Sequence, residues 1–251
     1  GKFGGIEPLV GLLVNGDSAK SSVNAAGALA SLSSKHTDNR TAIAKRLVSV
    51  LNSKSPERAA RVLGAMKSIC DSAANKTAIA KAGGIPPTIA WLGTEATETD
   101  AAHAVVALAE DNITCQALLV KLGGIPPLIQ VIAHAKTPKA CENAACALWH
   151  LGCNPDSQNA IAEAGGILPL VSMLSLESER AQELAAVVIV RLARGNARVS
   201  EQIAEVGGIP PLIKLMAGGT LYAQQQAVLS ISELALLPDN RDEIAVHQGV
   251  P

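Results

Sequence analysis

The sequence is short of aromatic residues, although it is rich in apolar ones. Aromatic side chains make up 2% of the 251 residues, whereas apolar residues as a whole make up 48%. The core must therefore be filled by Ala, Leu, Ile and Val through many small contacts, because few large rings are present. This composition favours thin, stacked helices over a thick globule.

An excess of charge and long apolar runs are also lacking. Lys and Arg number 21 against 22 for Asp and Glu, so no long-range field attracts nucleic acid or an anionic membrane. The longest apolar stretches, such as residues 185–190, fall far short of the ~20 residues that a membrane span needs. Residues 1–20 lack the charged-then-apolar order of a signal peptide. We expect no nucleic-acid partner and no direct membrane insertion.

Sites for chemistry are lacking as well. No phosphate-binding glycine loop, dinucleotide motif or zinc-protease motif occurs, and the histidines have no metal-ligand spacing. Cys146 and His150 stand at i, i+4, a thiol–imidazole spacing that an ordinary helix also shows. The sequence therefore predicts no enzyme, no cofactor and no metal site. The cysteines, which form no C-x-x-C pair, are predicted to be buried free thiols of a cytoplasmic or nucleo-cytoplasmic protein: Cys70, Cys115, Cys141, Cys146 and Cys153.

The strongest positive feature is an internal repeat. A phrase built on Gly-Gly-Ile and proline recurs at residues 4–9, 83–87, 123–128, 165–170 and 207–212. An aliphatic marker lies four positions before each Gly-Gly or its equivalent, at Ile43, Ile79, Leu119, Ile161, Ile203 and Ile244. These markers are spaced by 36, 40, 42, 42 and 41 residues. A period of ~40 residues indicates a helical repeat array.

Each unit predicts three helices. Residues 159–164 form a short first helix, which Gly165-Gly166 ends because glycine accepts the left-handed conformation common after a helix. Pro169 suits the first turn of a second helix, where its missing N–H costs little. A third, longer helix is predicted from about residue 180 to 193 by its apolar periodicity.

These patterns resemble the armadillo-repeat family, including its β-catenin-like and importin-α-like members. The third-helix signature of that family, A-A-x-A-L-x-N-L, is matched at residues 25–32, 101–108, 144–151 and 185–192. The resemblance implies an all-α fold, a right-handed α-solenoid (superhelix) of three-helix armadillo repeats. We expect one array over residues 1–251, with a partial repeat 1–34, repeats at about 35–71, 72–110, 111–152, 153–194 and 195–237, and a partial repeat 238–251.

The sequence departs from this pattern in two places. After Ala44 the chain runs directly into residues 46–51 without the Gly-Gly phrase, so we expect the first two helices of that repeat to be fused or joined tightly, with a bend of the solenoid there. The array also begins on a second helix and closes on a first helix with a degenerate phrase at residues 248–251. Solenoids need polar caps, so we expect an excerpt of a longer array, or ends that allow self-association.

The resemblance implies that third helices line a concave groove that binds extended peptides or partner proteins. In the family, an Asn ladder holds the ligand backbone, and importin-like members add a Trp ladder. Here the Asn positions hold Ser31, Ser68, Ala107, His150, Arg191 and Glu233, and the Trp positions hold Gly27, Gly64, His103, Cys146, Val187 and Leu229. Neither the Asn ladder nor the Trp ladder is present in this sequence, which argues against a nuclear import receptor.

The remaining groove has small residues in its first half and large polar ones in its second. Trp149 is either an interface anchor or a residue packed between third helices. Arg191 is expected to pair with Glu233 of the next repeat. The candidate binding residues are Ser31, Ser68, His103, Ala107, Trp149, His150, Arg191, Arg194 and Glu233.

Three Asn-x-Thr sequences, at Asn39, Asn75 and Asn112, match the glycosylation motif. Because the first two begin a predicted first helix, we interpret the side chains of Asn39 and Asn75 as helix caps.

The sequence thus favours a non-catalytic scaffold or adaptor that binds a partner protein or extended peptide. The alternative is a structural array that self-associates or extends within a cytoskeletal or ciliary assembly.

Overall fold

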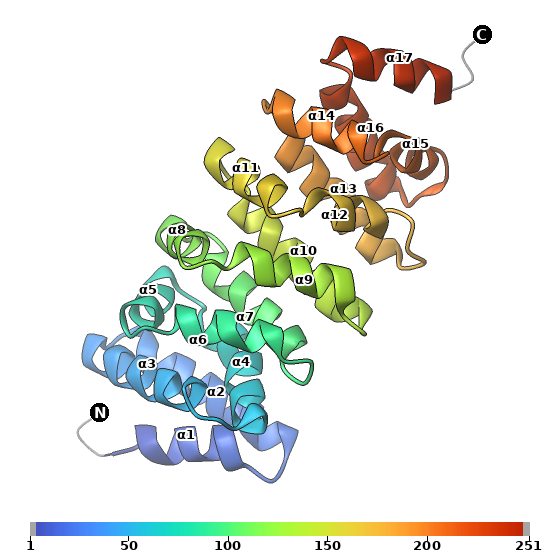
Figure 1. Cartoon of the computed structure of the whole chain (residues 1–251). Coiled ribbons are helices and arrows are strands. Elements are labelled where there is room, and N and C mark those ends of the chain that lie inside the picture. Colours follow the sequence, from blue (N-terminus) through green and yellow to red (C-terminus); the bar gives the residue numbers. More distant parts are fainter. Residues whose placement is uncertain (1–3, 248–251) are drawn as a thin grey trace. The chain divides into compact units, whose positions relative to one another are not determined.

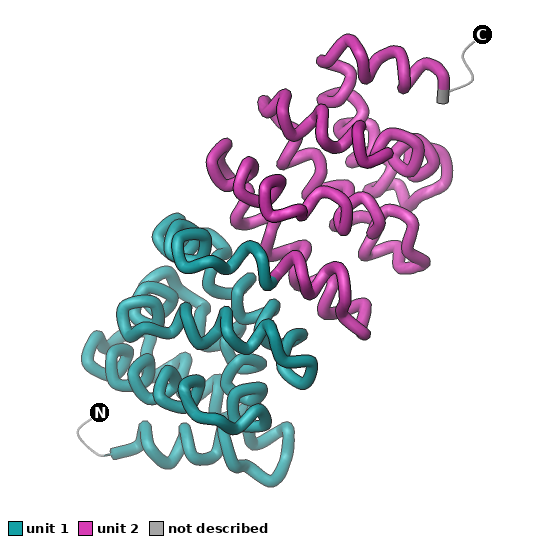
Figure 2. The backbone as a smooth tube through the Cα atoms, viewed as in Figure 1, with its two compact units in different colours: residues 1–127 teal, residues 128–251 magenta. Residues whose placement is uncertain are grey.

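The computed structural model describes residues 4–247, which contain 17 α-helices, one short 3₁₀ helix and no strand (Figure 1). The chain divides into two compact units, residues 1–127 and 128–251, which Figure 2 shows in teal and magenta. The division falls inside α9 (Ile125–His134). The predicted all-α class and the order of three helices per repeat are confirmed within each unit. The degenerate phrase at residues 248–251 lies outside the described residues.

Unit 1 stacks its third helices, α2, α4 and α7, against one another in chain order. Its first helices are α3, α5 and α8 (Figure 1). The elements of unit 1 are α1 (Ile6–Asn15), α2 (Ala19–Ser34), α3 (Thr37–Leu51), α4 (Pro56–Ile69), α5 (Ala73–Lys81), α6 (Ile85–Ala90), η1 (Trp91–Gly93), α7 (Glu98–Ala109) and α8 (Ile113–Lys121).

Unit 2 repeats the arrangement, with third helix α13 packed between α10 and α16. Its core is aliphatic, as the composition predicts, and Leu148, Ile189 and Leu234 are fully buried. Its remaining elements are α10 (Pro138–Leu151), α11 (Pro155–Glu163), α12 (Ile167–Met173), α13 (Glu179–Ala193), α14 (Ala197–Glu205), α15 (Ile209–Gly218), α16 (Leu221–Leu234) and α17 (Pro238–His247).

The two glycines that separate first and second helices have different physical roles. Gly165 has a φ of 79°, the left-handed conformation that other residues adopt only with strain. Gly166 has an ordinary φ, but a Cβ there would lie 2.8 Å from Ile161 Cγ2 and 2.9 Å from Ile161 O. Where the phrase is missing, α3 runs without interruption from Thr37 to Leu51. The predicted fusion is therefore confirmed.

The helix-cap prediction for Asn39 and Asn75 is wrong, and it is Asn112 that caps a helix. Asn112 precedes α8 and its side chain accepts a hydrogen bond at 2.9 Å from the backbone N–H three residues later. Asn75 and Asn39 instead lie inside α5 and α3, because those helices begin earlier than the motif suggested. Ser72 is the cap of α5.

Asn75 has a different role, as a buried link between repeats. Its amide nitrogen donates to Ile69 O, Ser33 Oγ and Asp71 Oδ1, each at 2.8 Å. Its amide oxygen accepts from Arg40 Nε at 3.0 Å. Asn75 thereby satisfies a carbonyl at the end of the preceding third helix and ties α5 to α3 and α2.

Within residues 4–247, no single helix is both long and apolar enough to cross a membrane. The consecutive helices α8 and α9 reach that length and composition only as a pair, which is bent by 80° at its break.

Candidate protein-binding surface

The third helices of unit 1 border a hollow of about 460 Å³, here called the unit-1 hollow. It lies among α2, α4 and α7, and its lining includes Val23, Ala26, Ala60, Gly64, Ser68 and Asp100. Most of these side chains are small, so the helix backbones are open to close approach. Gly64 and Ser68 lie where the sequence predicted a groove of small residues. Their neighbours Gly27 and Ser31 are exposed but do not line the hollow.

Asp100 gives the unit-1 hollow its one acidic side chain. It is half-buried in the first turn of α7, and no hydrogen bond or ion pair reaches its carboxylate within residues 4–247. A Cβ built on Gly64 would lie 3.6 Å from Asp100 Oδ1, so the carboxylate stands directly over that glycine. Burial raises the pKa of Asp100, and the nearby His103 partly offsets this effect.

Unit 2 has a hollow of about 540 Å³ among α10, α13, α16 and the start of α11, here called the unit-2 hollow. Its lining includes Trp149, Val187, Arg191, Arg194, Tyr222 and Gln226. The guanidinium carbon of Arg191 lies 4.0 Å from the centroid of the Trp149 ring, a cation–π geometry. The His150 ring meets Trp149 edge-on, with centroids 4.8 Å apart. Burial lowers the pKa of Arg191.

The predicted pair between Arg191 and Glu233 is wrong. Glu233 instead contacts Arg194, with Nε and Oε1 3.6 Å apart, while Arg191 is engaged on Trp149. Arg194 follows the last residue of α13 and lies largely in solvent. The contact is therefore a weak surface pair, worth at most about 1 kcal/mol.

The nine predicted binding residues are distributed over the two units. The unit-1 hollow contains Ser68, and the unit-2 hollow contains Trp149, Arg191 and Arg194. His103, His150 and Glu233 each act on a residue that lines a hollow. Ser31 is exposed outside the unit-1 hollow, and its hydroxyl donates to the carbonyl of Gly27 at 3.0 Å. Ala107 is only 6% exposed, so its side chain offers no binding surface.

Sequence reasoning missed several lining residues near the start of the third helices, above all Asp100 and Tyr222. Both residues precede the A-A-x-A-L-x-N-L signature, from which the groove positions were assigned. An inspection of the turn before that signature, rather than the signature alone, would have found them.

The cysteines form no disulfide in the part of the chain that the structure describes. Cys70, Cys115 and Cys141 are buried as predicted, Cys146 is half-buried, and Cys153 is exposed in the unit-2 hollow. Burial raises the pKa of Cys70 to about 12. Across residues 4–247, no group of three or more His, Cys, Asp or Glu side chains is placed to hold a metal ion.

Comparison with known proteins agrees with this geometry. Residues 114–152 match the model of the armadillo/beta-catenin-like repeat. These residues are therefore similar to one armadillo repeat. The human armadillo repeat-containing protein 3 is 37% identical over 108 residues, which cover 42% of this chain and 12% of that protein. The match therefore spans only a small part of the relative.

Solved armadillo structures share the fold. Computationally designed armadillo repeat proteins for modular peptide recognition superpose with a TM-score of 0.75 at 22% identity, covering 91% of this chain and 99% of theirs. A designed armadillo repeat protein in complex with the peptide (KR)4 gives 0.76 at 21% identity, over 92% and 99%. An engineered protein gives 0.82 at 26% identity, over 98% of this chain and 62% of that one.

Proposed function

We propose that this armadillo-repeat chain binds an extended segment of a partner protein along the faces formed by its third helices. The observation that carries the proposal is that each unit has a hollow bordered by its third helices, and that each hollow is lined by both apolar and polar side chains. The fold is also that of designed armadillo proteins described as made for peptide recognition.

The unit-1 hollow is suited to one Lys or Arg side chain of the partner. A carboxylate whose loss of water is only partly compensated is destabilising, and Asp100 is in that position because burial raises its pKa more than the nearby His103 lowers it. The nearby Arg61 is already held by Gly16 O at 2.6 Å and Ser22 Oγ at 3.1 Å. A cation from the ligand would supply the missing charge, while the apolar floor would contact its methylene groups.

The unit-2 hollow is suited to a less basic segment of a partner protein. Trp149 and Arg191 hold each other in place, so little side-chain entropy is lost when a ligand contacts them. Trp and Arg are also common among the residues that dominate binding energies. The guanidinium edge of Arg191 can donate to carbonyl or carboxylate oxygens of the ligand.

We further propose that this armadillo-like chain acts without catalysis, as the recognition part of a cytoplasmic scaffold or adaptor. Armadillo folds typically serve such roles. Self-assembly of the array is the alternative, and light scattering distinguishes the two. A molecular mass that does not change with concentration favours the adaptor.

A first experiment separates binding from folding. A peptide is selected from a random library on the wild-type chain, and its affinity is then measured for Gly64→Leu and for the control Gly27→Leu. Both glycines are exposed in the interior of third helices, so each substitution should raise helix stability by about 0.8 kcal/mol. Only Gly64→Leu fills the unit-1 hollow. We expect it to weaken binding roughly tenfold, about 1.4 kcal/mol, while Gly27→Leu leaves binding unchanged.

A second experiment tests the role of Asp100. Affinity for a selected peptide that carries a basic residue should increase as pH rises through the pKa of Asp100, because only the carboxylate attracts a cation. Asp100→Asn should remove this dependence. Equal affinity of Gly64→Leu and wild type, together with a pH profile unaffected by Asp100→Asn, would refute the assignment of the unit-1 hollow.

A further inference from the structure

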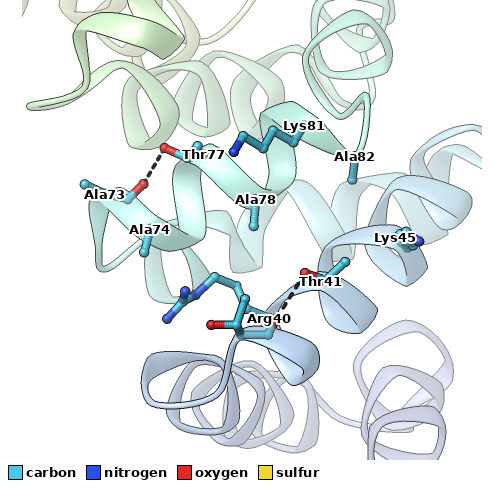
Figure 3. Close-up of a pocket in the computed structure, with 10 residues that line it drawn as sticks. Arg40, Thr41, Lys45, Ala73, Ala74, Thr77, Ala78, Lys81 and Ala82 are labelled. Atoms are coloured by element: carbon cyan, nitrogen blue, oxygen red, sulfur yellow. Dashed lines mark hydrogen bonds between the residues drawn. The ribbon is translucent and has the colours of Figure 1, made fainter.

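A third hollow lies apart from the third-helix faces, between the first helices α3 and α5 of unit 1 (Figure 3). Its volume is about 490 Å³. Alanines form much of its lining, including Ala73, Ala74 and Ala78 of α5. The proposed binding of a peptide to the third-helix faces does not involve this hollow. It is here called the first-helix hollow.

The charged side chains that line the first-helix hollow are all basic: Arg40, Lys45 and Lys81. Lys45 and Lys81 are exposed, and neither has an ion pair within residues 4–247. Arg40 is fixed by hydrogen bonds from its Nε to Ser33 O and Asn75 Oδ1, at 3.2 and 3.0 Å. Three positive charges thus surround an uncharged floor.

The corresponding place in unit 2, between first helices α11 and α14, is bridged. Arg198 of α14 contacts Glu163 of α11, with Nη1 and Oε1 2.8 Å apart. Counted from the repeat marker, Lys45 stands at the position of Glu163, and Ala74 stands at the position of Arg198. Both halves of the bridge are therefore absent from unit 1. The first-helix hollow therefore lacks the ion pair that joins the equivalent helices of unit 2.

We propose that the first-helix hollow binds an acidic segment of a partner protein, with carboxylates at intervals along an extended backbone. Figure 3 shows Arg40, Lys45 and Lys81 spread around the hollow rather than converging on one point. That spread does not suit a single small anion, and it suits a chain of several carboxylates. Lys121 of α8 occupies the same repeat position as Lys45 and Lys81, and so continues the row of lysines.

The threonines of the hollow do not supply donors to a ligand. The hydroxyls of Thr41 and Thr77 donate to the carbonyls of Thr37 and Ala73 in their own helices, at 3.0 and 2.8 Å (Figure 3). Recognition therefore depends on the lysine and arginine charges over an alanine surface. Binding of this kind weakens as salt increases.

The test restores the unit-2 bridge in unit 1. Binding of a fluorescent eight-residue polyglutamate peptide is measured by anisotropy at low salt for wild type and for Lys45→Glu/Ala74→Arg. The double variant should weaken binding at least fivefold, because the Lys45 contact is replaced by a repelling carboxylate and the new ion pair covers the alanine surface. The control Lys67→Glu/Ala90→Arg makes the same net charge change at residues that do not line the hollow. It should bind nearly as wild type does.

Several outcomes would overturn the proposal. Equal weakening by the two double variants would mean that net charge alone attracts the peptide. Binding to phosphatidylserine vesicles or to duplex DNA that is tighter than binding to the peptide, and that the bridge abolishes, would assign the hollow to a membrane or a nucleic acid. Concentration-dependent light scattering that the bridge abolishes would assign it to a second copy of this chain.

Discussion

Replacement of Asn75 by alanine should destabilise the chain far more than the equivalent replacement of Asn39. Asn75 is 1% exposed, and its loss leaves the carbonyl of Ile69 and the side chain of Arg40 without one hydrogen-bond partner each. A buried group left without its partner costs about 1–3 kcal/mol. We therefore expect Asn75→Ala to lower the free energy of unfolding by about 2–4 kcal/mol.

Asn39→Ala is the matched control, because Asn39 holds the same helical position in the preceding repeat. It makes one longer bond, to Leu32 O at 3.3 Å, and it is only half-buried. Its loss should cost about 0.5–1 kcal/mol. Urea unfolding followed by circular dichroism measures both variants, and a separate early transition would indicate unfolding of one part of the array. Equal losses for the two variants would refute the role assigned to Asn75.

Three further predictions concern stability. Gly165→Ala should lower the free energy of unfolding by about 1 kcal/mol, because alanine is strained in the left-handed conformation. Gly166→Ala should lower it more, because the new Cβ would lie 2.9 Å from Ile161 O. A lower urea midpoint for Gly165→Ala than for Gly166→Ala would contradict this. A double-mutant cycle of Trp149→Ala and Arg191→Ala should give a coupling of about 0.5–1 kcal/mol, and zero coupling would mean that the stacking contributes nothing. Burial raises the pKa of Asp100 above its ordinary value of 3.8, so the folded state binds more protons between the two values, and stability should fall as pH rises through that window. Asp100→Asn should remove that fall; an unchanged pH profile of the unfolding free energy would contradict it.

The repeat architecture was predictable because its signals are local. The left-handed backbone at position 165 requires glycine regardless of the neighbouring repeats. After Ala44 no glycine or proline interrupts the chain, so α3 continues to Leu51. The role of Asn75 was not predictable in this way. It depends on which carbonyls the preceding third helix places beside it, and the same residue type at position 112 is a true cap.

The candidate site was predictable only in part. The small residues Gly64 and Ser68 and the position of Trp149 followed from the helical signature. The partner of Arg191 could not be predicted, because Trp149 and Glu233 were both acceptable partners. The sequence does not show which of the two lies nearer to the guanidinium group. The role of Asp100 could not be predicted, because a carboxylate in the first turn of a helix is common. Only the packing of the surrounding helices shows that this one is half-buried.

The central claim is that third helices form the binding surface, and photo-cross-linking tests it most directly. Library-selected peptides that carry a photoreactive phenylalanine analogue are bound to the wild-type chain, irradiated, and mapped by mass spectrometry. We predict cross-links in α2, α4 and α7, in α10, α13 and α16, or in both sets of third helices. Cross-links confined to first and second helices would contradict the account.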